Sequence, residues 1–208
     1  AALTLATNNR KVMIIGDENS KNQFSNLVTF FSLSSINFLK ELNLNEVIKQ
    51  SSSINEISCG KLENLIEDHK FQIHFKDKNN ELGRVISNKI LNEKLDAKIN
   101  ENKNINDLKN INIQNCQFLK EKNILILESG EKIKTKLLII TEKKTNLLDQ
   151  NFKNNLIKKD LKQTSLVLDV KSKTKNHAYQ IFTEKGAIAY LPINENLASV
   201  IWSLDNSS

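Results

Sequence analysis

The chain of 208 residues has few of the residues that cross-link a backbone or break its regular structure. It contains two cysteines, one proline and five glycines. Cys59 and Cys116 show neither CxxC nor Cys/His spacing, and His69, His74 and His177 stand far apart in the sequence. The pattern predicts inert thiols in a reducing compartment and no metal site.

The sequence also lacks a long apolar run. No apolar stretch approaches the roughly 20 residues that span a bilayer, which argues against a transmembrane helix. The first eleven residues contain no initiator Met and no positively charged region before an apolar one. They are therefore not typical of a signal peptide.

The sequence also has no long run of residues of one charge. The net charge is +6 and the isoelectric point is about 9.2. Lysines nevertheless alternate with acids, and no aromatic residues lie between them to stack on bases, so we expect no nucleic-acid partner. Lys, Asn and Ile are abundant, which matches a genome with a coding bias toward A and T.

The apolar fraction of 39% and the charged fraction of 26% are ordinary for a globular protein of one large or two small domains. Ala1–Thr7 is predicted to be helical, and Lys11–Ile15 is predicted to be a buried parallel strand. Leu137–Ile140 has the same continuous apolar character as a second such strand. A helix that leads into a buried strand is half of a βαβ unit, so the first strand is expected before Ala1.

Further elements follow from periodicity and capping signals. The residues at 30–44 have apolar side chains at helical spacing, Asn45 is a candidate cap for a short helix to Gln50, and Ser87 is a candidate cap for a helix over 88–100. Strands are predicted at Ile54–Ser58, Phe71–Phe75, Ile111–Phe118, Asn123–Leu127 and Ile133–Ile140.

The last third of the chain predicts a β-meander. Three apolar, β-rich stretches are separated by polar turn signals. They are Thr164–Val170, Tyr179–Phe182 with Ala187–Pro192, and Ala198–Trp202.

The order of residues in this region resembles a known pattern. In sequence it reads Gln163-Thr164, then Tyr179-Gln180-Ile181-Phe182-Thr183, Gly186, Leu191-Pro192 and Val200-Ile201-Trp202-Ser203. The flavin-dependent aromatic hydroxylases of ubiquinone biosynthesis show a Gln-Thr strand, Trp-x-Arg-Phe-Thr, a Gly turn, Leu-Pro and Trp-Ser in the same order. The chain is similar to that family at six separate landmarks.

The resemblance implies the fold of para-hydroxybenzoate hydroxylase, of class α/β. Residues 1–160 would form part of an FAD/NAD(P)-binding Rossmann-like core, and residues 161–208 part of an antiparallel β-sheet substrate domain. The family's Gly-rich loop would precede Ala1, and its Gly-Asp-Ala-Ala-His segment would follow Ser208. We therefore expect an internal piece of a longer protein, which binds FAD weakly or not at all when isolated.

The resemblance also places the FAD contacts. The family's ribose-binding acid falls on Gly16 without gaps, and Asp17 follows directly. Lys89 takes the place of a flavin-contacting Arg, and Phe118 ends a strand whose backbone would face the adenine. Glu142 stands where the family has the Asp of an Asp-Gly pair. Asp17 could equally lie in a solvated loop and Lys89 on an exposed helix surface.

Tyr179 replaces the family Trp and Ile181 its Arg. With Pro192, they would line a site for a hydrophobic aromatic substrate with a prenyl tail. The same side chains would also suit an ordinary core. Leu27 and Lys143 replace a family Arg and the Gly of the Asp-Gly pair, so each loses a family feature at a cofactor position.

The function implied by the resemblance is that of an FAD-dependent monooxygenase. It would use NAD(P)H and O2 to hydroxylate a polyprenylated phenol, from the cytoplasm at the periphery of a bacterial inner membrane. No catalytic acid, base or nucleophile is assigned. The alternatives are a degenerate, non-catalytic relative that acts as a scaffold in a biosynthetic complex, and another FAD-dependent aromatic-ring hydroxylase.

Overall fold

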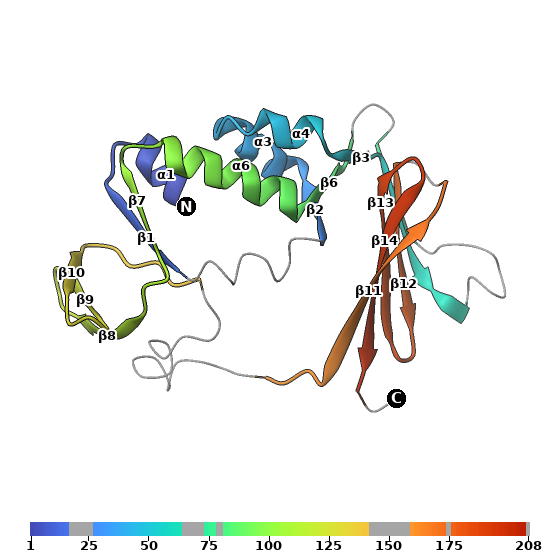
Figure 1. The fold of residues 1–208 in the computed structure, drawn as a ribbon. Coiled ribbons are helices and arrows are strands. Elements are labelled where there is room, and N and C mark those ends of the chain that lie inside the picture. Colours follow the sequence, from blue (N-terminus) through green and yellow to red (C-terminus); the bar gives the residue numbers. More distant parts are fainter. Residues whose placement is uncertain (17–26, 64–72, 78–80, 142–158, 174–175, 207–208) are drawn as a thin grey trace. The chain divides into compact units, whose positions relative to one another are not determined.

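A computed structural model describes residues 1–16, 27–63, 73–77, 81–141, 159–173 and 176–206 (Figure 1). The chain forms two compact units, Ala1–Gln23 with Asn102–Asp160 and Phe24–Glu101 with Leu161–Ser208. The described residues form helices and four separate sheets, which confirms the α/β class. The Rossmann-like character of the core and the division at residues 160 and 161 stay predictions.

The first unit begins with a helix and a parallel strand pair. Helix α1 (Ala2–Thr7) buries Leu3 and Ala6, three residues apart and therefore on the same face. Strand β1 (Val12–Gly16) then pairs in parallel with β7 (Ile105–Lys109). The predicted helix and parallel strand are confirmed, although β1 is only half-buried.

Three antiparallel strands form the other sheet of this unit. Their order is β10-β9-β8, with β8 at Ile113–Phe118, β9 at Asn123–Leu127 and β10 at Lys132–Thr135. Cys116 and Leu125 are buried at its centre, and burial raises the pKa of the Cys116 thiol. A buried thiol with a raised pKa is a poor nucleophile, which agrees with the prediction of an inert cysteine.

Leu137–Ile140 forms no strand, and this prediction is wrong. Its side chains do alternate as in extended chain. Leu138 and Ile140 pack on the core around Cys116, whereas Leu137 and Ile139 are 61% and 51% exposed. Because no strand among the described residues lies beside this segment, its apolar run has no ladder to join.

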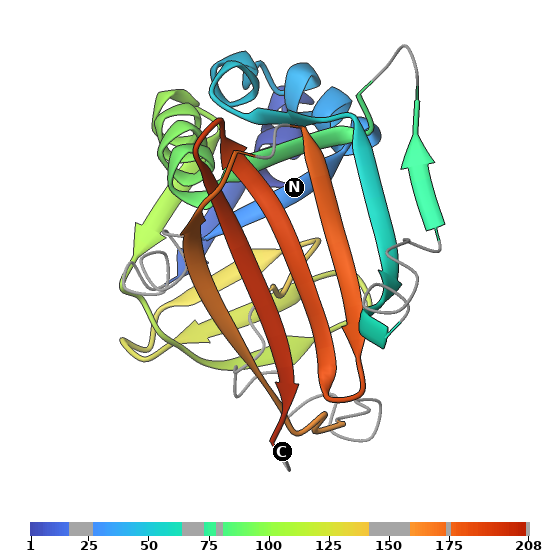
Figure 2. The ribbon, with the colours of Figure 1, turned by 90° about the vertical axis from the view of Figure 1, so that its right-hand side faces the viewer.

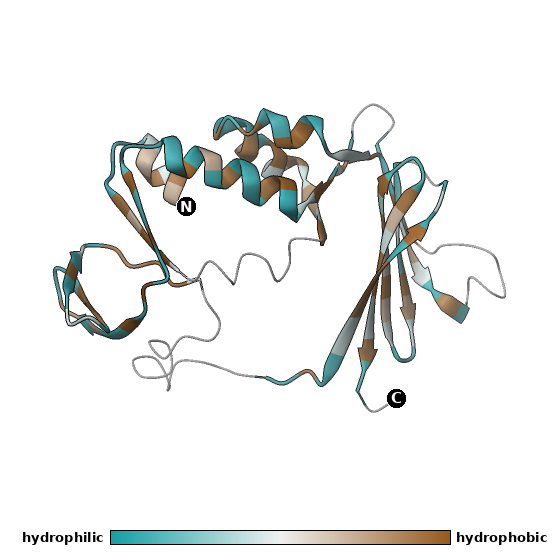
Figure 3. Cartoon of the chain, in the orientation of Figure 1, coloured by the Kyte–Doolittle hydropathy of each residue, from teal (hydrophilic) through white to brown (hydrophobic). Residues whose placement is uncertain are grey.

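The described residues of the second unit form a three-stranded antiparallel sheet, β2-β6-β3, and helices α3, α4 and α6. Ile36, Leu39 and Ile86 form a buried core between helices and sheet, and apolar and polar residues alternate around the helices (Figure 3). The elements are β2 (Val28–Ser32), α3 (Leu33–Glu41), α4 (Asn45–Lys49), β3 (Ser52–Ile54), β6 (Gly83–Ser87) and α6 (Asn88–Glu101).

Two details of this unit differ from the predictions. Phe30 and Phe31 belong to β2, because that strand pairs with β6, so the helix begins only at Leu33. Asn45 is the first helical residue of α4 and is not its cap, a position that Leu44 occupies.

A six-stranded sheet contains the remaining described strands of the second unit (Figure 2). Its strand order is β11-β14-β13-β12-β4-β5. The predicted meander is confirmed for three strands, but β11 pairs with β14, and β12 pairs in parallel with β4. The strands are β4 (Glu56–Lys61), β5 (Ile73–Lys76), β11 (Gln163–Lys171), β12 (His177–Thr183), β13 (Gly186–Asn194) and β14 (Leu197–Asp205).

The two faces of this sheet have different neighbours. Ala178 and Leu191 pack with Ile54 and Val85 of the three-stranded sheet. Successive side chains of a strand point to opposite faces, so Tyr179 lies on the other one. We call that other side the Tyr179 face. Tyr179 is in register there with Ser58, Tyr190, Val200 and Leu168.

Candidate functional site

The Tyr179 face is aromatic and aliphatic over β12, β13 and β14. Ile181 follows Tyr179 along β12, and its register partners are Ile188 and then Trp202. These side chains are half-buried or exposed. The face therefore offers partly accessible apolar surface, which suits the binding of an apolar aromatic compound.

The structure brings two of the three predicted substrate residues together. Tyr179 and Ile181 lie two residues apart on the same face of β12. Pro192 of β13 is fully buried and opposes Ala198, next to an irregularity of the register. The contact of all three residues with a substrate stays a prediction.

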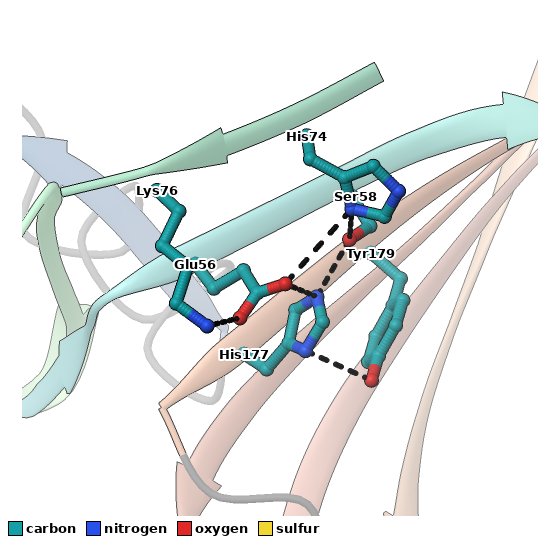
Figure 4. Close-up of polar contacts among 6 residues, drawn as sticks. All are labelled: Glu56, Ser58, His74, Lys76, His177 and Tyr179. Carbon is teal, nitrogen blue, oxygen red and sulfur yellow. Dashed lines mark hydrogen bonds and ion pairs between the residues drawn. The ribbon is translucent and has the colours of Figure 1, made fainter. Parts of the chain in front are cut away.

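A polar cluster adjoins Tyr179 at the β4 and β5 side of the same face (Figure 4). Glu56 and Ser58 come from β4, His74 and Lys76 from β5, and His177 from β12. Our sequence analysis missed this cluster, because it treated the histidines as isolated. The spacing of two in Glu56-x-Ser58 and His74-x-Lys76 places each pair on one strand face, but it does not reveal that the strands meet.

Hydrogen bonds link the cluster in a chain. The Ser58 hydroxyl lies 2.9 Å from His74 Nδ1 and 2.7 Å from His177 Nε2. The other ring nitrogen of His177, Nδ1, lies 3.1 Å from the Tyr179 hydroxyl. The rings of His177 and Tyr179 stack at 4.1 Å, and Tyr190 meets Tyr179 edge-on at 5.6 Å. Each group is thus held by more than one contact.

The ionisable side chains of the cluster have different protonation states at neutral pH. Lys76 Nζ donates to Glu56 Oε2 at 2.9 Å, and this hydrogen bond is the main cause that lowers the pKa of Glu56. Burial lowers the pKa of His177 more than the nearby Glu56 raises it. Burial and Glu56 also raise the pKa of Tyr179. At neutral pH, Glu56 is therefore ionised while His177 and Tyr179 are neutral.

The geometry does not fit a serine hydrolase. In a Ser-His-acid triad the acid binds the imidazole nitrogen that the serine does not use. Here Glu56 Oε1 lies 3.7 Å from His177 Nε2, the nitrogen that also contacts Ser58. Ser58 is also fully buried, so a substrate could not reach it. Among the residues that the structure describes, no group of three His, Cys, Asp or Glu side chains is arranged to hold a metal ion.

The predicted FAD contacts are spread over the chain. Lys89 is exposed at the start of α6 in the second unit, and Phe118 is exposed at the end of β8 in the first. Asp17 and Glu142 lie outside the residues that the structure describes. The roles of all four stay predictions.

Acidification should lower the free energy of unfolding of the second unit. Because the folded pKa of His177 lies below its ordinary value of 6.5, the unfolded chain binds the proton first. Stability is then lost as the pH falls from about 6.5 through the folded pKa, by at most about 1.4 kcal/mol per pH unit. Glu56, whose folded pKa lies below its ordinary value of 4.5, adds a second loss below that pH.

Urea unfolding followed by Trp202 fluorescence at a series of pH values measures this effect. The His177→Gln variant should lose the decrease that begins near pH 6.5 and keep the decrease below pH 4.5. Identical pH profiles of the variant and the wild type would contradict the assignment.

Comparison with known proteins gives a likeness of structure only. No protein-family model matches the sequence, and no curated protein matches it. The fold is similar to that of PqsL from Pseudomonas aeruginosa, a probable FAD-dependent monooxygenase, with 13% identity and a TM-score of 0.74 over 99% of this chain and 57% of that one.

Two further solved structures are similar. One is 2-methyl-3-hydroxypyridine-5-carboxylic acid oxygenase, with 15% identity and a TM-score of 0.74 over 100% of this chain and 56% of that one. The other is p-nitrophenol 4-monooxygenase PnpA from Pseudomonas putida DLL-E4, with 10% identity and a TM-score of 0.73 over 100% and 55%. The chain has the fold of these enzymes and spans little more than half of their length.

Proposed function

We propose that the full-length protein is an FAD-dependent monooxygenase that hydroxylates an aromatic ring. The observation that carries the proposal is the fold, which follows those three monooxygenases over 99% or more of the chain. Fold alone does not determine activity, so the proposal also needs a binding surface for the substrate. The Tyr179 face, which is aromatic and aliphatic, suits an aromatic ring.

Some of the described residues fit an FAD. Lys89 is exposed at the start of α6, a helix of 14 residues, where the positive end of the helix dipole and a lysine side chain suit a phosphate group. Phe118, at the end of β8, would offer its backbone to the adenine. Bound FAD, reduced by NAD(P)H, would activate O2, and the protein would orient the substrate and exclude water.

The proposed substrate is a polyprenylated phenol of ubiquinone biosynthesis. Strands β12, β13 and β14 place no Lys or Arg on the Tyr179 face, and Lys76 of β5 on that face is already paired with Glu56, so no free cation of these strands would pair with a carboxylate. Ile181 and Ile188 provide apolar surface for a hydrocarbon tail, and the neutral Tyr179 hydroxyl can hydrogen-bond a phenol oxygen.

We propose that this protein acts in the bacterial cytoplasm, in peripheral contact with the inner membrane and in a complex with other enzymes of the pathway. The prenyl tail of the substrate supports the membrane contact. No helix in the described part of the chain is long and apolar enough to cross a membrane.

The rival function is a non-catalytic scaffold in a biosynthetic complex. It is favoured by four positions at which a family residue is lost. Gly16, Leu27, Lys143 and Ile181 stand where the resemblance expects an acid, an Arg, a Gly and an Arg. A turnover assay distinguishes the monooxygenase from the scaffold. Full-length protein supplied with FAD, NADPH and a short-chain prenylphenol should give a hydroxylated product detectable by mass spectrometry. Absence of both NADPH oxidation and hydroxylated product would favour the scaffold.

Introducing a cation on the Tyr179 face should change the substrate preference. In Ile181→Arg, the guanidinium can pair with a ligand carboxylate, and a hydrogen bond to a charged group contributes about 1.5–3 kcal/mol. The affinity for a hydroxybenzoate relative to the matching alkylphenol should rise about 10- to 100-fold. Fluorescence titration of Trp202 measures both affinities.

Gln180→Arg is the matched control, since Gln180 is the next residue on the same strand and points to the opposite face. It should leave the affinity ratio unchanged. Equal ratios in the two variants would mean that Ile181 does not face the ligand.

A further inference from the structure

We infer that strand β11 is the contact surface of a two-fold symmetric homodimer, in which the β11 strands of two copies of this chain pair in antiparallel and join their six-stranded sheets. The inference rests on the backbone and side chains of β11 and is independent of the proposed function. β11 is one outer strand of the sheet and β5 is the other (Figure 2).

The two outer strands differ in how well they resist pairing. Proteins protect an outer strand from unwanted partners by keeping it short, or by placing charged residues, proline or a bulge on it. β5 has four residues, and two of them, His74 and Lys76, are ionisable. β11 has nine residues, contains no proline, and pairs with β14 without a bulge. β11 is therefore the edge that can accept another strand.

β11 also exposes apolar side chains on both faces of the sheet. Leu166 and Leu168 are 45% and 46% exposed on the Tyr179 face, and Val167 between them is 37% exposed on the other face. Trp202 of β14 is in register with Leu166 and is 37% exposed. A continuous exposed apolar surface of this kind is typical of a site that a protein partner covers.

The hydrogen bonds at the ends of β11 show which of its backbone groups face outward. Ser172 N donates to Asn196 O at 3.1 Å, and at the other end Asn206 N donates to Lys162 O at 2.8 Å. In an antiparallel ladder, the residues that exchange hydrogen bonds alternate along the strand. The even-numbered residues therefore bond to β14, and the odd-numbered residues of Gln163–Lys171 direct their N–H and C=O groups away from it. No strand in the described part of the chain pairs with these groups.

A second copy satisfies all of these outward groups when the two-fold axis passes beside Val167, the central residue of β11. Val167 then lies opposite the partner's Val167. Ser165 lies opposite the partner's Asp169, and Gln163 opposite the partner's Lys171. Odd-numbered residues face odd-numbered residues in this register, so the two strands direct their hydrogen-bonding groups at each other. A shift by one residue would place outward groups opposite inward ones.

The side chains are complementary in the same register. On the Tyr179 face, Leu166 of each copy lies opposite the partner's Leu168, so exposed leucines of both copies cover one another. On the other face, the Asp169 carboxylate lies opposite the partner's Ser165. The Ser203 hydroxyl can donate to Ser165 at 3.1 Å, which leaves the Ser165 hydrogen for the carboxylate. No like charges are opposed, whereas an axis beside Asp169 would oppose two carboxylates.

This pairing is closed at two copies. Identical strands that pair in antiparallel use the same surface of both copies, as in an isologous dimer. Pairing of β11 with β5 of another copy would instead continue into an open fibre, and the shortness and charges of β5 oppose it. Because the two-fold axis is perpendicular to the sheet, the Tyr179 faces of both copies lie on the same side. The dimer thus forms one apolar surface that continues across both β11 strands.

Cysteine cross-linking of the full-length protein tests the register. Opposed residues that exchange hydrogen bonds have Cα atoms about 5.5 Å apart, a separation that a disulfide can bridge. Val167→Cys should therefore form a disulfide-linked dimer on mild oxidation, seen as a band of twice the monomer mass on a non-reducing gel. The wild type, with its native cysteines, should form none.

Ser165→Cys is the matched control. Ser165 faces the same edge of β11, but it lies four residues along the strand, about 14 Å, from the partner's Ser165. It should not cross-link alone, whereas a mixture of Ser165→Cys and Asp169→Cys proteins should, because these positions are opposed. No disulfide in Val167→Cys, or an equally efficient one in Ser165→Cys alone, would overturn the proposed pairing.

A charge at the axis should weaken the dimer. Val167→Lys removes the valine contact and places two lysines directly opposite each other, so the dimer Kd from sedimentation equilibrium should rise at least about 10-fold. Val167→Thr keeps a β-branched side chain and should change the Kd by less than about threefold. Trp202 fluorescence during urea unfolding shows that both variants are folded. Equal Kd values in Val167→Lys and the wild type would contradict the interface.

A wild-type protein that stays monomeric would overturn the dimer, and hydrogen exchange of the Val167 amide would then identify the alternative. Slow exchange in the monomer would show that another segment of the same polypeptide covers β11. Fast exchange would show that the edge is open to water.

Discussion

Replacing Gly186 by alanine should unfold the six-stranded sheet. Gly186 begins β13 at the hairpin from β12 and has a φ of 145°, where side chains are rarely tolerated. A Cβ atom there would lie 1.8 Å from the backbone oxygen of Ser203 in β14. Because backbone cannot move aside without breaking the pairing of β13 with β14, we expect a loss of more than about 4 kcal/mol in the free energy of unfolding.

Urea unfolding followed by Trp202 fluorescence measures this loss, since Trp202 lies on β14 next to Ser203. The matched control is Glu184→Ala, an exposed residue of the same turn, which should change stability by less than about 0.5 kcal/mol. A loss below about 1 kcal/mol in Gly186→Ala would mean that the close approach of the two strands is wrong. The Tyr179 face depends on this approach.

Truncating Ile54 to alanine should have the second-largest effect on stability. Ile54 is 0% exposed and packs with Val85 and Ala178 between the two sheets of the second unit. Its truncation leaves a cavity where the six-stranded sheet rests on the three-stranded one. The expected cost is about 2–5 kcal/mol.

Ile73→Ala is the matched control. It removes the same atoms from β5, where Ile73 is 53% exposed and few contacts are lost. Its cost should stay below about 0.5 kcal/mol. Equal destabilisation of the two variants by chemical denaturation would contradict the packing of one sheet on the other.

Local patterns in the sequence were sufficient for much of the fold. The polar turns around β13 and β14 predict their hairpin, and the helical spacing of Leu91 and Leu95 predicts α6, because both signals depend on residues close together in the chain. The pairing of β4 with β12 could not be foreseen in this way. His177 lies 119 residues from its hydrogen-bond partner Ser58, and no period in the sequence connects them.

Strand and helix signals also failed where pairing decides the outcome. Phe30 and Phe31 fit a helical spacing, but the ladder with β6 makes them a strand. Leu137–Ile140 has the composition of a buried strand, but no strand in the described part of the chain pairs with it. The family resemblance reached further than periodicity, since it implied the fold that the solved monooxygenases share with this chain.

The visible absorbance spectrum of the purified full-length protein tests the central claim most directly. An FAD-dependent monooxygenase should show the absorbance bands of bound, oxidised flavin, and NADH or NADPH should bleach them. A spectrum without flavin, unchanged after incubation with excess FAD and removal of the unbound cofactor, would contradict the proposed function.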